Sequence, residues 1–246
     1  MKRFVVMMLV SIMLVVTAMP TMKAKAASTA DEWYNITMAS MRAKVVNGTD
    51  GNDIAYSATW YSGLSEVEVL ARLLYAEAPW WIADKKCVAM VLWNRVQVGW
   101  YASTLYGVAV QNGQFATITG SVNETAGARI VDIESASWQN ALRYACTIYV
   151  TGTTNPKWAL GISEFSYQRD FRSFLSFNGK AYDLSGEPHI NIDGTEYGIY
   201  DIYIPVHGYF ETVAEAVNQY LSPSNAENNL PYYADGEGVN IYFGLE

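Results

Sequence analysis

The stretch LARLLYAEAPWW, residues 70–81, places a glutamate on the apolar side of a predicted helix. Leu74 and Leu70 precede Glu77 by three and seven residues, so all three share one face of an α-helix. A carboxylate on a buried face is costly unless it is paired, hydrogen-bonded or protonated. The helix alone favours a structural glutamate, salt-bridged or reaching solvent at the helix end, over a functional acid.

This first strong helix has a clear start and end. Ser65 and Glu68 have the spacing of a capping box, and Pro79 cannot continue a helix, so the pattern predicts a helix over 65–78. On its opposite face, Glu68 and Arg72 have the spacing of an i,i+4 ion pair.

Further helices are expected along the chain. A short one is expected within 31–46, a second over 82–98 and a third over 134–151. The helix over 82–98 is apolar nearly all round, which predicts the central buried helix of the domain. One face of the third helix consists of small and aliphatic residues: Ala141, Ala145 and Ile148.

The pattern changes after Pro156. Residues 162–168 and 197–206 are rich in aromatic and β-branched residues, as strands are, and turn residues separate them. We therefore expect an α+β fold that is mainly helical with a small antiparallel β element. The expected organisation is a leader over 1–26, an N-terminal extension over 27–63, a main domain over 64–210, and a C-terminal helix (211–221) with an acidic tail over 211–246.

The first 26 residues have the pattern of a secretory signal peptide. A basic start, Met-Lys-Arg, precedes an apolar run over 4–19, and Ala-Lys-Ala at 24–26 forms a small-x-small cleavage site. The run is short for a membrane span and no stop-transfer pattern follows it. We expect an exported protein of the cell envelope or exterior, cut after residue 26 and not inserted in the membrane; an uncut leader that tethers the protein is the alternative.

Without that leader the chain is strongly acidic. Its four basic residues come off the 16 of the whole sequence, which leaves 12 basic against 24 acidic residues and a formal charge of −12. This charge argues against nucleic acid as a partner and against electrostatic adhesion to anionic membranes.

Cysteine and histidine are sparse. The sequence contains two cysteines, Cys87 and Cys146, and two histidines, too few for a metal cluster of recognised spacing. We therefore expect no metal and no cofactor. A disulfide between the cysteines and two buried thiols are both compatible with the sequence.

Three blocks of the helical half resemble the catalytic domain of the cell-wall hydrolase family, whose best-known members are the SleB-type spore cortex-lytic enzymes. The blocks are LAR with Glu77-Ala78, VAMVLWNRV at 88–96, and Gly113-Gln114-Phe115. The clear resemblance covers about 64–120 and is diffuse at 158–168 and 207–210. The chain departs from the family where Pro79-Trp80-Trp81 replaces the usual Arg-Gly-Glu. This departure, with diverged residues at 169–200, bears on substrate preference more than on reaction class.

The resemblance implies a lysozyme-like fold and an enzyme that acts on peptidoglycan. Family members cut the β-1,4 bond from N-acetylmuramic acid to N-acetylglucosamine, typically as lytic transglycosylases, and their glutamate corresponds to Glu77. A general acid needs a carboxyl whose pKa is raised, and the apolar setting of Glu77 supplies the desolvation. Taken with the leader and the other blocks, Glu77 is expected to be the catalytic acid rather than a structural residue.

The number of carboxylates separates two possible outcomes of the reaction. In a transglycosylase the muramic C6 hydroxyl attacks C1, so one glutamate donates a proton and then accepts another. A hydrolase would normally need a second carboxylate. Asp84, Glu164 and Asp170 are candidates, but each is more typical of a surface or structural residue. The sequence therefore favours a transglycosylase, with a hydrolytic muramidase and a non-catalytic glycan-binding or envelope-structural protein as alternatives.

The expected substrate-binding residues neighbour Glu77 in sequence or through the resemblance: Gln114, Phe115, Trp80, Trp81 and Tyr167. Gln114 is expected to hydrogen-bond the sugar, or else only to tie its own loop, and Phe115 is expected to support the groove from the core. Asn94 and Arg95 are expected to cap and brace their helix, with a carboxylate partner. The expected partner is a peptidoglycan glycan strand, from either a spore cortex or a vegetative wall.

Overall fold

The computed structural model describes residues 29–46, 49–79, 82–97, 101–152 and 154–162, together with strands between 173 and 245. The predicted leader over 1–26 and the predicted helix over 211–221 lie outside the described residues. Within the described part of the chain, no helix combines the length and hydropathy needed to cross a bilayer.

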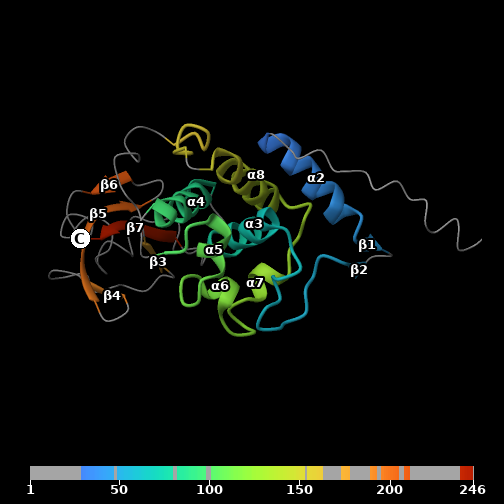
Figure 1. Cartoon of the computed structure of the whole chain (residues 1–246), viewed down its shortest axis with the longest axis horizontal. Coiled ribbons are helices and arrows are strands. Elements are labelled where there is room, and N and C mark those ends of the chain that lie inside the picture. Colours follow the sequence, from blue (N-terminus) through green and yellow to red (C-terminus); the bar gives the residue numbers. More distant parts are fainter. Residues whose placement is uncertain are drawn as a thin grey trace, which may run out of the picture.

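Residues 29–162 form a helical body (Figure 1). Its helices are α2 (Ala30–Arg42), α3 (Glu66–Glu77), α4 (Ile82–Gln97), α5 (Leu105–Val110), α6 (Ala116–Thr119), α7 (Ala126–Arg129) and α8 (Ala136–Thr151). The predicted helices over 65–78, 82–98 and 134–151 are confirmed to within two residues at each end. The first expected helix ends at Arg42, earlier than its pattern indicated.

The central helix of the body is α3. Every residue from Val67 to Leu74 is buried, and the helix packs against α2, α4, α5, α6, α7 and α8. The prediction that the helix over 82–98 occupies the centre is therefore wrong, although α4 is largely buried too. The central position of α3 could not be predicted from its hydropathy, because two of its buried residues, Glu68 and Arg72, are charged.

Arg72 fastens α3 to two neighbouring segments. Its guanidinium lies 2.9 Å from the Glu68 carboxylate, so the predicted i,i+4 pair is confirmed, but inside the core rather than on the surface. The same guanidinium donates to backbone carbonyls of Asn52, Ala128 and Arg129. A buried arginine is tolerated because its donors are met by acceptors.

Side-chain caps set the helix starts. The Ser65 hydroxyl accepts from the Glu68 N–H at 3.2 Å, as the predicted capping box requires. The Glu68 carboxylate, however, pairs with Arg72 and with Lys44, at 3.5 Å, instead of completing the box. A complete capping box is formed at α2, where Thr29 and Glu32 bond each other's backbone N–H.

The segment expected as an N-terminal extension packs against the same core. Met38 and Met41 of α2 are buried, and α2 packs against α8. Strands β1 (Val45–Val46) and β2 (Thr49–Asp50) pair in antiparallel orientation. Farther along, the Trp60 indole donates to the Ile118 carbonyl at 3.0 Å, which joins this segment to α6.

The two cysteines are free, buried thiols, Cys87 on α4 and Cys146 on α8. Burial raises the pKa of both, that of Cys146 to about 12. Of the two alternatives left by the sequence, the structure has the thiols rather than the disulfide.

Strands follow the helical body along the chain. They are β3 (Ser173–Phe177), β4 (His189–Ile192), β5 (Thr195–Ile204), β6 (Gly208–Phe210) and β7 (Val239–Leu245). The strand order is β3-β7-β5-β4, β6 also pairs with β5, and all the pairs are antiparallel. The sheet lies beyond α4, on the side away from α2 (Figure 1).

The fold class is mainly helical, and the prediction of an α+β, lysozyme-like fold with a small antiparallel β element is wrong. Among the described residues between 29 and 162, which hold Glu77 and the described core, the strands are only the two-residue β1 and β2. The reason is that α3 is enclosed by other helices, which leaves none of its faces for a sheet. Strand-like composition after Pro156 did not show which core a sheet would join.

Candidate functional site

Glu77 is the last residue of α3 and lies where the helix leaves the core. Leu74 and Ala78, on either side of it along the chain, are fully buried, whereas the Glu77 side chain is partly exposed. Ala78 caps the helix with a non-helical backbone, and Pro79 ends it. The carboxyl therefore stands at the boundary between core and solvent.

Thr117 of α6 holds the Glu77 carboxyl. Its hydroxyl donates to Glu77 Oε1 at 2.6 Å, a short bond typical of a hydroxyl and a charged acceptor. Thr117 lies two residues after Phe115, the N-cap of α6. The loop formed by Gly113, Gln114 and Phe115 (the GQF loop) therefore leads directly to Thr117. Sequence reasoning missed Thr117, although it lies just beyond a block that the resemblance had singled out.

Arg95 of α4 supplies positive charge to the site. Its side chain is buried, and its charge lowers the pKa of Glu77. The guanidinium also lies over the rings of Phe115, at 4.8 Å, and Tyr101, at 5.3 Å, and donates to the Gln114 carbonyl at 3.5 Å. Arg95 and the Glu77 carboxyl thus interact electrostatically.

Opposing influences set the acidity of Glu77. Burial raises its pKa above the ordinary value, and this effect exceeds the lowering by the Thr117 hydrogen bond and by the charge of Arg95. A carboxyl of this kind keeps its proton at a higher pH than a solvated glutamate does. After it gives up that proton, Thr117 and Arg95 stabilise the carboxylate.

The GQF loop (residues 113–115) leads into α6, which contacts Glu77 through Thr117, and the three residues of the loop have different surroundings. Gly113 has a positive φ of 78°, which turns the chain so that Phe115 enters the core at 1% exposure. Phe115 therefore supports the site from below, as predicted, and cannot present a ring face to a ligand. Gln114 is partly exposed, and its backbone accepts from Arg95 and donates to Gln111.

Several predicted residues cannot be placed beside Glu77. Trp80, Trp81 and Tyr167 lie outside the described residues, as do the possible second carboxylates Glu164 and Asp170. Asp84 is described: it is buried on α4, at 2% exposure, and its charge acts on Lys85 and Cys87. The groups that act on the pKa of Glu77 do not include Asp84.

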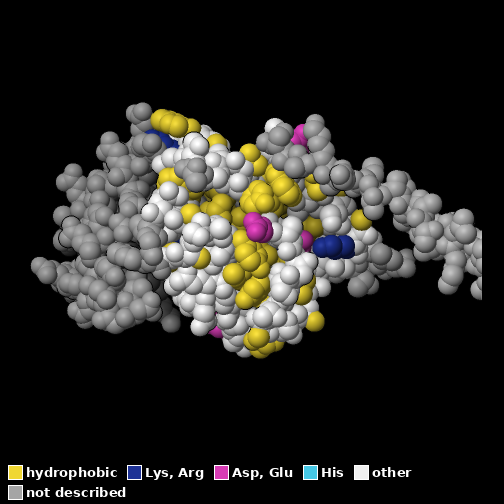
Figure 2. Space-filling view, viewed as in Figure 1, with side chains coloured by type: hydrophobic (Ala, Val, Ile, Leu, Met, Phe, Trp, Pro, Cys, Tyr) yellow, Lys and Arg dark blue, Asp and Glu magenta, His cyan; other side chains and the backbone are white. Residues whose placement is uncertain are grey.

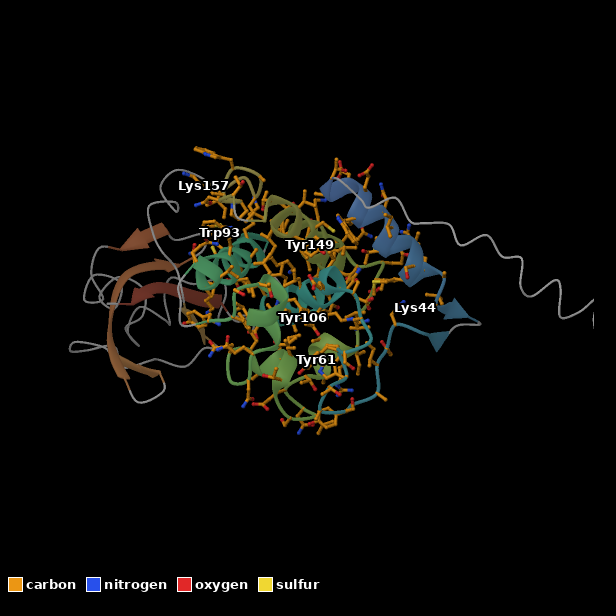
Figure 3. The ribbon with its side chains drawn as sticks, viewed as in Figure 1. Lys44, Tyr61, Trp93, Tyr106, Tyr149 and Lys157 are labelled. Carbon is orange, nitrogen blue, oxygen red and sulfur yellow. The ribbon has the colours of Figure 1, made fainter. Side chains whose placement is uncertain are left out.

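A band of tyrosines lies at the opposite end of α3 from Glu77. Tyr149, Tyr106 and Tyr61 follow one another from top to bottom near the middle of Figure 3, and hydrophobic side chains surround an acidic one in the same area of Figure 2. Partial burial raises the pKa of Tyr106 and Tyr149, and the charge of Glu66, the first residue of α3, adds to the effect. The sequence did not single out this band.

The described residues contain no group of three or more acidic, histidine or cysteine side chains placed to hold a metal ion. What the site does combine is a desolvated acid, a hydroxyl donor and a guanidinium, which suits proton transfer. The chain matches no known family model, no curated protein and no solved structure.

Proposed function

We propose that the protein is an exported peptidoglycan-cleaving enzyme that acts as a lytic transglycosylase, with Glu77 as general acid and then general base. The observation that carries the proposal is the desolvated Glu77 carboxyl, held by Thr117 at 2.6 Å beside Arg95. The resemblance of residues 64–120 to SleB-type enzymes supports the substrate class, and the signal-peptide pattern supports the location.

In the proposed reaction Glu77 first donates its proton to the glycosidic oxygen between N-acetylmuramic acid and N-acetylglucosamine. The bond from C1 to that oxygen breaks, and positive charge develops at C1 and the ring oxygen. Thr117 and Arg95 stabilise the Glu77 carboxylate at this stage. The muramic C6 hydroxyl then attacks C1 and passes its proton to Glu77, which leaves a 1,6-anhydro end and restores the acid without consuming water.

The test is release of soluble fragments from purified cell-wall sacculi by the wild type and by Glu77→Gln. Glutamine keeps the size of the side chain but cannot donate a carboxyl proton, so we expect release to fall by roughly a hundredfold or more, as for loss of a general acid. Glu66→Gln, at the exposed first residue of the same helix, is the matched control and should retain activity.

Mass spectrometry of the fragments separates the proposed reaction from its alternatives. Transglycosylation gives anhydro ends, which are lighter by one water than the reducing ends that a muramidase would leave. Sacculus binding without any soluble product would instead indicate a glycan-binding protein. Full activity of Glu77→Gln would overturn the role given to Glu77.

A further inference from the structure

The backbone immediately after Glu77 is held by a buried lysine. Lys85 of α4 is 1% exposed, and its ammonium donates to the carbonyls of Ala78 and, at 3.1 Å, Pro79. Carbonyls at a helix C-terminus have no partner within the helix and carry its partial negative charge. The ammonium therefore meets the carbonyl of Ala78, the C-cap of α3, and the carbonyl of the residue that follows it.

A second helix holds the same turn. The Ser137 hydroxyl of α8 donates to the Pro79 carbonyl at 2.6 Å. The residues after Glu77 are thus tied to α4 through Lys85 and to α8 through Ser137, while the Glu77 carboxyl is tied to α6 through Thr117. Displacing the turn would move the carboxyl relative to its hydroxyl donor.

We infer that Lys85 is a positioning residue, which fixes the Ala78–Pro79 turn and thereby holds the Glu77 carboxyl against Thr117. The role in turnover rests on the proposed function, whereas the effect on Glu77 itself does not. Lys85 does not act as an acid or base on the substrate, because its ammonium is directed to backbone carbonyls.

The surroundings of Lys85 predict a dependence on pH. Burial lowers its pKa to about 8, and the charge of Asp84, its neighbour on α4, opposes this effect. Toward the ammonium, the two residues after α3 present their carbonyls, and α8 contributes the neutral hydroxyl of Ser137 to the same turn. Above about pH 8 the amine loses its charge, and its hold on the carbonyls weakens.

If activity falls above about pH 8, the titration of Lys85 would not cause that fall by unfolding the protein. Because the folded pKa of Lys85 lies below its ordinary value of 10.5, the unfolded chain binds more protons between about 8 and 10.5. The contribution of Lys85 to the free energy of unfolding therefore rises with pH in this window.

The experiment compares Lys85→Met with Lys86→Met in the full chain. Lys86, the next residue, reaches the Gly161 carbonyl and the Tyr144 ring, away from the end of α3. We expect Lys85→Met to lower kcat by roughly 10- to 100-fold with little change in KM, as a small displacement of a catalytic group does. Lys85→Arg should restore part of kcat and weaken its alkaline fall, and Lys86→Met should match the wild type.

Carbon-13 NMR titration of the Glu77 carboxyl tests the positioning directly. Loss of the Thr117 hydrogen bond should raise the pKa of Glu77 in Lys85→Met but not in Lys86→Met. This readout holds even if the wild type releases nothing from sacculi, so failure of the proposed function and failure of this inference are distinguishable. If Lys85→Met does not fold, Ser137→Ala should show a smaller shift in the same direction. An unchanged Glu77 pKa and kcat would overturn the inference.

Discussion

At the scale of single residues, the burial that suits Glu77 for catalysis also lowers the stability of the folded protein. A general acid must keep its proton near the pH at which it works, and burial raises the pKa of Glu77 in that direction. The same burial disfavours the ionised form, so the folded state becomes less stable relative to the unfolded chain when Glu77 loses its proton. Thr117 and Arg95 offset part of this cost.

Replacing Glu77 by glutamine should therefore stabilise the protein at neutral pH. Because the folded pKa of Glu77 is raised, the wild type loses stability as the pH rises from the ordinary value of 4.5 through the folded value. The neutral amide avoids this loss. We expect the Tm of Glu77→Gln to exceed that of the wild type at pH 7.

Thermal unfolding followed by circular dichroism measures this difference in Tm at pH 7 and again below pH 4.5. At the lower pH the Glu77 carboxyl is protonated in both the folded and the unfolded protein. The difference should shrink at the lower pH. A difference of the same size at both values would contradict desolvation as its cause.

Thr117 provides a second prediction at this scale. Thr117→Val keeps the shape of the side chain but removes its hydroxyl donor to Glu77, so the pKa of Glu77 should rise further. Its carboxylate would lose a charge-assisted bond, and we expect kcat to fall on the order of tenfold. Thr117→Ser should retain most of the activity. Thr119→Val, on the same helix, loses only a bond to the Phe115 carbonyl at 3.2 Å and is the control for kcat and the NMR titration.

At the scale of elements, α3 joins the core to the site. Its middle, Val67 to Leu74, is buried on all sides, and only its last residue carries the candidate acid. The short helices α6 and α7 pack against it, and α6 brings Thr117 to the acid. Anything that loosens α3 should therefore disturb both stability and the site.

Arg72 tests this link. Arg72→Met would leave Glu68 buried beside Lys44 alone and would strip donors from the carbonyls of Asn52, Ala128 and Arg129. Breaking a buried, hydrogen-bonded ion pair in this way costs about 3–5 kcal/mol of unfolding free energy. Chemical denaturation followed by tryptophan fluorescence measures this loss of unfolding free energy.

The matched control is Arg42→Met, which removes an exposed pair with Glu134 of similar length, 2.9 Å. Because exposed pairs are screened by solvent, its denaturation midpoint should stay close to that of the wild type. Equal losses in the two variants would contradict the role given to the buried pair.

Local chemistry explains what the sequence could predict about these elements. Ser65 and Pro79 mark the ends of α3 by themselves, and the face formed by Ala141, Ala145 and Ile148 is buried as its spacing indicated. Contacts between residues far apart in the chain have no comparable local pattern in the sequence. Thr117 meets Glu77 across 40 positions, and charged side chains in the middle of α3 concealed its central place.

At the scale of the whole molecule, the described core belongs to one region of the chain. The core residues that the structure describes run from Met38 to Ile162, and they include members of α2, α3, α4 and α8. The candidate acid, its hydroxyl donor and Arg95 lie on α3, α6 and α4 of the same region. The strands from 173 onward pair with one another.

A chain of residues 27–162 should therefore fold without the strands. A region of this size can enclose a core of its own, and α3 finds its packing partners among helices that the fragment retains. We expect helical circular dichroism, a single cooperative transition, and a raised pKa of Glu77 close to that of the full chain. Arg72→Met in the fragment should lower the transition as it does in the full chain. A fragment that lacks a cooperative transition, while the full chain has one, would show that the helical body depends on the residues after 162.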